Sequence, residues 1–157
     1  MFGSIIKITV KDNGDGIIYE QLPIVFKKFY ESHKSAKGNV DSRFSRGKNG
    51  YGRFTFFKFA NLASWNTIYK KDGELYKYSI RIDAQKLTDY NATSPERVEE
   101  AVTGTIVNFE DIITDDLSVN WVEEKLIPYL KAEFAWYFKV HPECKLYIND
   151  EILDCSS

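Results

Sequence analysis

Hydrophobic residues at the start of the chain follow two different spacings. A β-branched run over residues 5–11 stops at a glycine-rich turn, and this pattern predicts a strand. Residues 19–30 then repeat apolar side chains every three or four positions, which predicts a helix with Pro23 in its first turn. The repeating residues are Leu22, Val25, Phe26 and Phe29. The polar segment 31–49 follows, and a loop of such length usually serves a function.

The middle of the chain changes from a helical to a strand-like spacing. Residues 53–63 are predicted to form a helix with a hydrophobic side. That side holds Phe54, Phe57, Phe59 and Leu62. Strands at residues 65–70 and 75–82 are predicted to pair as a hairpin, because Asp72 and Gly73 between them favour a tight turn.

The next segment is polar and acidic over residues 86–101. Pro95 is predicted to open a short helix there, since proline suits the first helical position. A β-branched run over residues 104–109 predicts a further strand.

The last forty residues predict a long helix and a small hairpin. Residues 118–138 keep helical spacing behind Ser118, a residue that favours the N-cap, and Pro128 predicts a kink or a break. Residues 145–153 predict the hairpin, so the C-terminal helix and hairpin together occupy about residues 118–154. Helices and antiparallel hairpins in this order predict an α+β fold, in which one sheet carries helices on one face.

Composition narrows the class of protein without naming its chemistry. A chain of 157 residues fits one domain, and 43% hydrophobic residues argue against disorder of the whole. A net charge of −2 indicates neither nucleic acid nor a lipid surface. No apolar run reaches the ~20 residues of a membrane span. Cys144 and Cys155 lack metal-ligand spacing and fit a reduced protein, so we expect a cytoplasmic location.

A first candidate site follows the first predicted strand, in the sequence Asp12-Asn13-Gly14-Asp15-Gly16-Ile17. A carboxylate that ends a strand before Gly-x-Gly is well placed to accept hydrogen bonds from a ligand. Ordinary turn-forming residues would give the same pattern. A calcium loop is disfavoured, because the sixth residue from Asp12 is Ile17 instead of Gly and the twelfth is Pro23 instead of Glu.

A second candidate site has three glycines ahead of the predicted helix 53–63. Such a loop can turn successive amides toward a phosphate, and the helix N-terminus adds a favourable dipole. The residues are Gly47, Lys48, Asn49, Gly50, Tyr51, Gly52 and Arg53. A dinucleotide fold would need a strand directly before this loop, whereas a polar segment precedes it. Nearby arginines could contact nucleic acid, but phosphates of a nucleotide explain them with fewer assumptions.

Together the two loops resemble the ATP site of the GHKL superfamily of histidine kinase-like and Hsp90-like ATPases. That superfamily includes gyrase B, the ninety-kilodalton heat-shock chaperones, sensor histidine kinases, MutL and MORC proteins. The resemblance covers residues 5–112 and implies the Bergerat ATP-binding fold, a two-layer α/β sandwich with a mixed, mostly antiparallel sheet. The end of the chain resembles the end of such domains in bacterial ATP-binding proteins.

The resemblance also implies a role for each motif. Asp12 would accept a hydrogen bond from the exocyclic amine of adenine, Gly14 and Gly16 would shape the base pocket, and Ile17 would lie beside the base. Residues 31–49 would form the ATP lid, and the glycine-rich loop after it would hold the phosphates. In the family a Gly-Thr pair on a late strand supports the base, which implies this role for Thr105. The expected ligands are ATP or ADP with Mg2+.

One family motif is missing upstream of Asp12. In the family, a helix before this strand carries a Glu that activates water and an Asn that holds Mg2+, and no Glu-x-x-x-Asn precedes Asp12 here. We expect a truncated fragment that does not hydrolyse ATP by itself, and a degenerate family member is the alternative. Loss of a core helix would bare a face of the sheet, so we also expect a homodimer through that face.

Two other functions stay open. A non-catalytic interaction module that keeps the fold would explain the missing Glu and Asn. A sensor histidine kinase ranks third, because His33 falls in the lid segment and His141 in a His-Pro step, and neither suits a phosphoacceptor helix.

Overall fold

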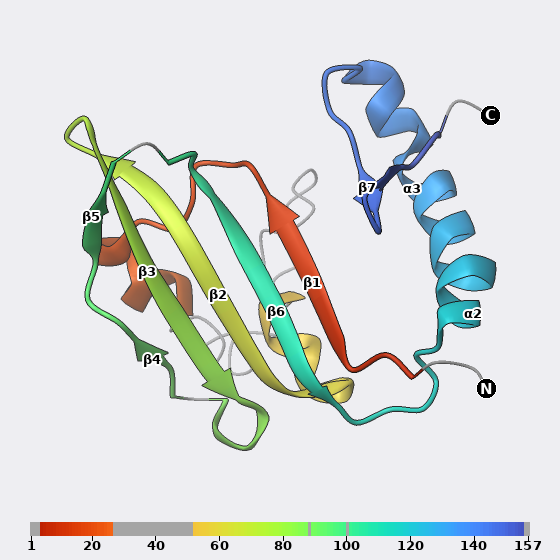
Figure 1. The fold of residues 1–157 in the computed structure, drawn as a ribbon, viewed down its shortest axis with the longest axis horizontal. Coiled ribbons are helices and arrows are strands. Elements are labelled where there is room, and N and C mark those ends of the chain that lie inside the picture. Colours follow the sequence, from red (N-terminus) through yellow and green to blue (C-terminus); the bar gives the residue numbers. More distant parts are fainter. Residues whose placement is uncertain (1–3, 27–51, 88, 100, 156–157) are drawn as a thin grey trace, which may run out of the picture. The chain divides into compact units, whose positions relative to one another are not determined.

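The structure is a computed structural model that describes residues 4–26, 52–87, 89–99 and 101–155. The chain divides into two units, each described by itself. The first, called the sheet unit here, is Ile6–Thr114, and the second, the helical unit, joins Met1–Ile5 with Asp115–Ser157. Figure 1 shows the strands of the sheet unit and the helices and small hairpin of the helical unit.

A single antiparallel sheet forms the frame of the sheet unit. Its strands are β1 (Lys7–Asp12), β2 (Ala60–Lys71), β3 (Glu74–Asp83), β4 (Asn91–Ala92), β5 (Glu96–Val98) and β6 (Gly104–Ile112). Their order is β1-β6-β2-β3-β4, and β5 also pairs with β3. Every pairing among these strands is antiparallel. Because β6 lies between β1 and β2, Asp12 pairs with Thr105 and Thr105 pairs with Thr67.

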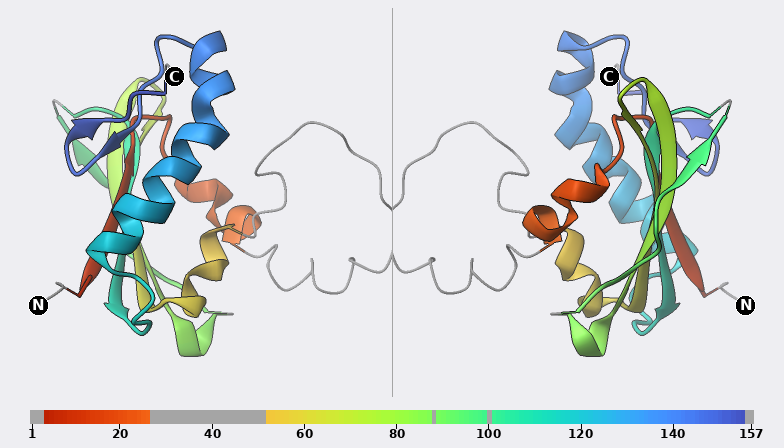
Figure 2. Two further views of the ribbon diagram at one scale, coloured as in Figure 1. Left: turned by 90° about the vertical axis from the view of Figure 1, so that its right-hand side faces the viewer. Right: turned by 90° about the vertical axis from the view of Figure 1, so that its left-hand side faces the viewer.

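Helical segments cover one face of this sheet, as Figure 2 shows. They are η1 (Tyr19–Gln21), the helical residues 22–26, and the 3₁₀-helix η2 (Gly52–Lys58). Their apolar side chains pack on the inward-facing residues of the sheet and form the core. The core holds Leu22, Phe26, Phe56, Ala60, Ala63, Trp65, Tyr69, Tyr78, Ile80 and Ile82. The predicted α+β fold with helices on one face is confirmed.

The opposite face of the sheet is polar, because side chains alternate between the two faces of each strand. Cross-strand polar pairs line it: Thr9 with Asn108 at 2.9 Å, and Ser79 with Asn66 at 2.7 Å. Lys7 forms an ion pair with Glu110 at 2.9 Å. This alternation fixes the register, since a shift by one residue would move the apolar set to the solvent side.

The helix predicted over residues 53–63 is wrong in its second half. The helical part is η2, and from Ala60 the chain is already in β2, paired with Ile112 of β6. Phe56 is buried whereas Phe57 is 39% exposed, so the predicted apolar side is also shifted. Pairing with a distant strand buries residues 60–63 more completely than a helical extension would, and such tertiary contacts override local propensity.

The short helix predicted after Pro95 is also wrong. Residues Glu96–Val98 form β5, which pairs with β3 from Leu75 to Lys77. Proline lacks an N–H and is tolerated next to an edge strand, where no ladder bond is lost. The helix prediction failed because nothing local indicates that the edge of β3 is free to accept this segment.

The helical unit contains α2 (Val119–Trp121), the π-helical turn η4 (Val122–Leu126) and α3 (Ile127–Val140). Ser118 caps the first turn, accepting a hydrogen bond from the Trp121 N–H at 3.2 Å, as predicted. A break at Pro128 does not occur. The wider turn just before the proline relieves the clash that its ring would make with the preceding turn, so the helix continues.

A two-residue turn joins β7 (Tyr147–Ile148) to β8 (Glu151–Ile152). Asn149 and Asp150 have φ of 49° and 67°, the positive values that a tight hairpin turn requires. The predicted hairpin is therefore confirmed. Aromatic rings of α3 contact one another, with Phe134 and Phe138 stacked at 5.7 Å between centroids. No described residue of the helical unit is buried. Across the described ranges, no helix is long and apolar enough to span a membrane.

Candidate functional site

The loop after β1 is held by the side chain that ends the strand. The Asp12 carboxylate accepts two backbone hydrogen bonds on one oxygen, Oδ1, from Gly14 N at 2.9 Å and Thr105 N at 3.3 Å. The other oxygen, Oδ2, accepts none from the described part of the chain. The side chain is exposed. Asp12 therefore fixes the loop with Oδ1 and keeps Oδ2 free to accept a hydrogen bond from a ligand.

Two glycines let backbone segments approach closely at this point. Gly16 has φ of 75°, and a Cβ there would lie 2.1 Å from the Ile68 carbonyl oxygen. Gly104 has φ of 145°, and a Cβ there would lie 2.3 Å from the Asp12 carbonyl oxygen. No side chain fits either position without moving backbone. Both glycines are needed to bring the loop against β2 and the start of β6.

Thr67 on β2 joins this site, and the sequence analysis missed it. Its Oγ1 accepts from the Ile17 N–H at 2.9 Å and lies 3.1 Å from Thr105 Oγ1 and 3.3 Å from the Gly104 carbonyl oxygen. Thr67 is 1% exposed and Thr105 is 6% exposed. A signal was present in the sequence. Thr67 falls between Trp65 and Tyr69 on the inward side of its strand, where a polar residue needs a partner.

The region around this site is also what relates the chain to known proteins. A family model described as "Histidine kinase-, DNA gyrase B-, and HSP90-like ATPase" matches residues 3–114. This chain belongs to that family. The match ends at Thr114, the last residue of the sheet unit, and the GHKL resemblance and the Bergerat fold are thereby confirmed. The chain is a GHKL-type ATP-binding domain.

A protein similar to this GHKL domain is the B-type subunit of the type 2 DNA topoisomerase 6 from Pyrococcus abyssi (strain GE5 / Orsay). The two are 32% identical over 80 residues, which is 51% of this chain. The matched region is 14% of the topoisomerase polypeptide, so this chain is similar to a small part of that protein.

The structure brings together one of the two predicted groups of GHKL site residues. Asp12, Gly14, Gly16, Ile17 and Thr105 meet at the ends of β1 and β6, with Ile17 partly buried against the core. Gly52 begins η2, followed by Arg53. Outside the described residues lie the predicted lid, residues 31–49, and Gly47, Lys48, Asn49, Gly50 and Tyr51. The proximity of the two groups therefore stays a prediction.

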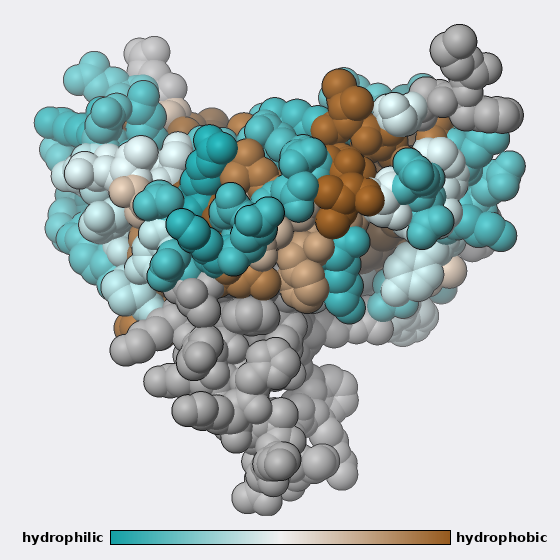
Figure 3. All heavy atoms as spheres, turned by 90° about the horizontal axis from the view of Figure 1, so that it is seen from below, coloured by the Kyte–Doolittle hydropathy of each residue, from teal (hydrophilic) through white to brown (hydrophobic). Residues whose placement is uncertain are grey.

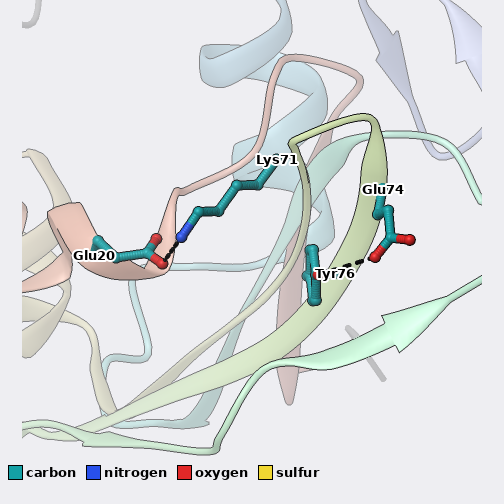
Figure 4. A network of polar contacts seen from close by, with 4 residues as sticks. All are labelled: Glu20, Lys71, Glu74 and Tyr76. Carbon is teal, nitrogen blue, oxygen red and sulfur yellow. Dashed lines mark hydrogen bonds and ion pairs between the residues drawn. The ribbon is translucent and has the colours of Figure 1, made fainter.

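An ion pair ties the segment after the site to the β2–β3 hairpin, as Figure 4 shows. Lys71 lowers the pKa of Glu20 through their hydrogen bond, and Glu20 in turn raises the pKa of Lys71. On the neighbouring strand, the Tyr76 hydroxyl donates to Glu74 at 3.1 Å, which raises the pKa of Tyr76. These side chains are solvent-accessible, so we assign them a role in holding η1 near the hairpin and no chemistry.

Other chemistry finds little support in the described residues. They contain no group of three or more His, Cys, Asp or Glu side chains that could hold a metal ion. Cys144 and Cys155 are both free thiols. Mg2+ would therefore have to be bound mainly through a nucleotide, as is common for this ion.

Proposed function

We propose that this GHKL domain binds ATP or ADP with the adenine at the Asp12 carboxylate. The single observation that carries the proposal is the division of labour between the two carboxylate oxygens. Oδ1 is occupied by the N–H groups of Gly14 and Thr105, which fixes the orientation of the side chain. Oδ2 then offers a pre-oriented acceptor to the 6-amino group of adenine, and orientation in advance lowers the entropic cost of binding.

Selection of adenine follows from the same oxygen. Guanine carries a carbonyl oxygen at the position of the adenine amine, so an acceptor would face an acceptor. A site that hydrogen-bonds a ligand group strongly rejects analogues that lack the group, because its own polar atom is left unpaired. Gly14, Gly16 and Ile17 are proposed to shape the base pocket, with Thr105 beside the base.

We propose that the phosphates and their Mg2+ are bound by the glycine-rich loop. That loop consists of Gly47, Lys48, Asn49, Gly50, Tyr51, Gly52 and Arg53, with the lid formed by residues 31–49. Hydrolysis needs a base and a magnesium ligand in addition to these groups. No Glu-x-x-x-Asn precedes Asp12 in these 157 residues, so the proposal for them is nucleotide binding, and hydrolysis is proposed for the intact parent.

Calorimetric titration with ATP and ADP plus magnesium tests this proposal. Asp12→Asn keeps an oxygen for Gly14 and Thr105 but turns an N–H toward the ligand amine. We expect its affinity for ATP to fall about 10- to 100-fold, the worth of a hydrogen bond to a charged group. Asp15→Asn is the matched control, because it makes the same charge change at an exposed position of the same loop.

The expected control result is an affinity within about twofold of wild type, as for a surface change. Equal affinity of wild type and Asp12→Asn for ATP would contradict the proposed adenine site. No binding by wild type would instead favour the non-catalytic interaction module. A comparison of ATP with GTP then checks base selection, with ATP expected to bind more tightly.

We further propose that a second copy of this chain covers the β1 end of the inward sheet face. Val10, Val107, Trp65 and Ile80 form one cross-strand row, in which Trp65 and Ile80 are buried while Val10 is 54% exposed. Figure 3 likewise shows hydrophobic side chains breaking a largely hydrophilic surface. Light scattering should give a dimeric mass that Val10→Glu lowers and Lys11→Glu, on the opposite face, does not. A monomeric wild-type mass would exclude the dimer.

A further inference from the structure

We propose that Thr67 is a positioning residue of the nucleotide site, whose buried hydroxyl sets the direction in which the Thr105 hydroxyl donates. The inference rests on the proposed binding of adenine at Asp12. It concerns a residue on β2 that belongs to neither of the two loops recognised from the sequence. Its role is to convert Thr105 into a hydrogen-bond donor toward the base.

Thr67 is the one side chain that reaches both parts of the described site. Its Oγ1 accepts from the Ile17 N–H at 2.9 Å, which fixes the end of the loop that starts at Asp12. The same oxygen lies 3.1 Å from Thr105 Oγ1, and Thr105 N donates to Asp12 Oδ1 at 3.3 Å. Displacement of Thr67 would therefore shift both the loop and the residue beside the adenine-reading carboxylate.

The direction of these hydrogen bonds follows from counting protons. A threonine hydroxyl has one proton and two acceptor sites. The Ile17 N–H takes one acceptor site of Thr67. The Thr67 proton then goes either to the Gly104 carbonyl at 3.3 Å or to Thr105 Oγ1 at 3.1 Å.

These two choices give Thr105 opposite properties. When Thr67 donates to Gly104, the Thr105 proton is drawn back to Thr67, and Thr105 offers the ligand only an acceptor. When Thr67 donates to Thr105, the Thr105 proton is released toward the ligand. We assign the second arrangement to the nucleotide-bound state, because adenine has acceptor nitrogens on either side of its amine, N1 and N7, and Asp12 is an acceptor only.

The base therefore meets a pair of complementary groups: an acceptor at Asp12 and a donor at Thr105. The donation from Thr105 reaches one ring nitrogen, directly or through a water. Thr67 makes this possible without leaving its own proton unpaired in a buried place, which would be unfavourable. Valine at this position would keep the shape of the side chain and remove the hydroxyl.

Titration with base analogues tests the assignment. Wild type, Thr67→Val and Thr67→Ser are titrated with ATP, 1-deaza-ATP and 7-deaza-ATP, which keep the 6-amino group and each lack one ring nitrogen. Wild type should bind one of the two analogues about three- to tenfold more weakly than ATP, the value of one neutral hydrogen bond. Thr67→Val should bind that analogue and ATP almost equally, and Thr67→Ser should restore the wild-type ratio.

A merely structural role for Thr67 predicts a different result. Thr67→Val would then weaken all three ligands together and leave their affinity ratio at the wild-type value, which would overturn the inference. Equal wild-type affinity for all three ligands would overturn it as well, and that measurement does not depend on the folding of any variant. Failure of the proposed function is separate, since it appears as no loss of ATP affinity in Asp12→Asn.

Discussion

The sheet unit and the helical unit are both rich in aromatic residues, yet among the described residues only the sheet unit has a buried core. All ten buried hydrophobic residues lie in the sheet unit, whereas Trp136 of α3 is 72% exposed. The long strands β2 and β3 present a wide face on which helices can pack. One helix and a hairpin of two-residue strands offer no such face. Aromatic content therefore does not locate a core, but strand length and alternation do.

Truncation of a core aromatic should give the largest effect. Phe56 is 1% exposed and contacts Trp65 and Phe109, so Phe56→Ala should lower the free energy of unfolding by about 3–5 kcal/mol. The neighbouring Phe57→Ala, at a position 39% exposed, should lower it by less than about 1.5 kcal/mol. Urea denaturation measures both. Similar losses for the two variants would mean that the core is wrongly placed.

A methyl group at Gly16 should have the next largest effect. The close approach to Ile68 forces the backbone to move, so Gly16→Ala should lower the free energy of unfolding by about 2 kcal/mol more than Gly73→Ala does. Gly73 is the matched control, since its φ of 85° is similar while no atom lies within 4 Å of its added Cβ. Equal effects would attribute the cost to φ alone.

Removal of one hydroxyl from the core should have a smaller, pH-dependent effect. The Tyr78 hydroxyl is buried with no partner among the described residues, and burial raises its pKa above the ordinary 10.0. The folded state then keeps this proton at pH values where the unfolded state has lost it, so stability falls as the pH rises above about 10. Tyr78→Phe should weaken that fall. Urea titrations between pH 8 and 11, on the order of one unit apart, would show it.

The smallest effect is expected in the helical unit. Trp136→Ala removes a large but exposed side chain, so the free energy of unfolding should change by no more than about 0.5 kcal/mol. Intrinsic fluorescence and urea denaturation check this directly. A loss comparable to that of Phe56→Ala would break the comparison, because it would reveal a partner surface for Trp136.

The parts of the fold predicted correctly depend on neighbours in sequence. Asp72 with Gly73 and Asn149 with Asp150 form the expected turns, and Ser118 forms the expected cap. Such features involve only a few consecutive residues, so local chemistry decides them. Residues 60–63 and Glu96–Val98 were predicted wrongly because distant strands, β6 and β3, determine their conformation.

The site shows the same division. Resemblance to the GHKL superfamily placed Asp12 and Thr105 together, and the register of β1 with β6 pairs them. Thr67 escaped notice because it belongs to no motif and meets Ile17 only through the fold, 50 positions away in the sequence. Propensity and spacing do not indicate which inward-facing polar residue of a strand will find such a partner.

The close approaches at Gly16 and Gly104 bear on how relatives of this domain should be sorted. Both glycines are demanded by contacts between backbone segments of the protein itself, with Ile68 and with Asp12. A homologue that has lost its nucleotide would still need them, so the glycines of the fingerprint diagnose ancestry. Asparagine at position 12 could accept the same bonds from Gly14 and Thr105, and only a reader of the adenine amine requires aspartate. The carboxylate therefore separates working sites from vestigial ones.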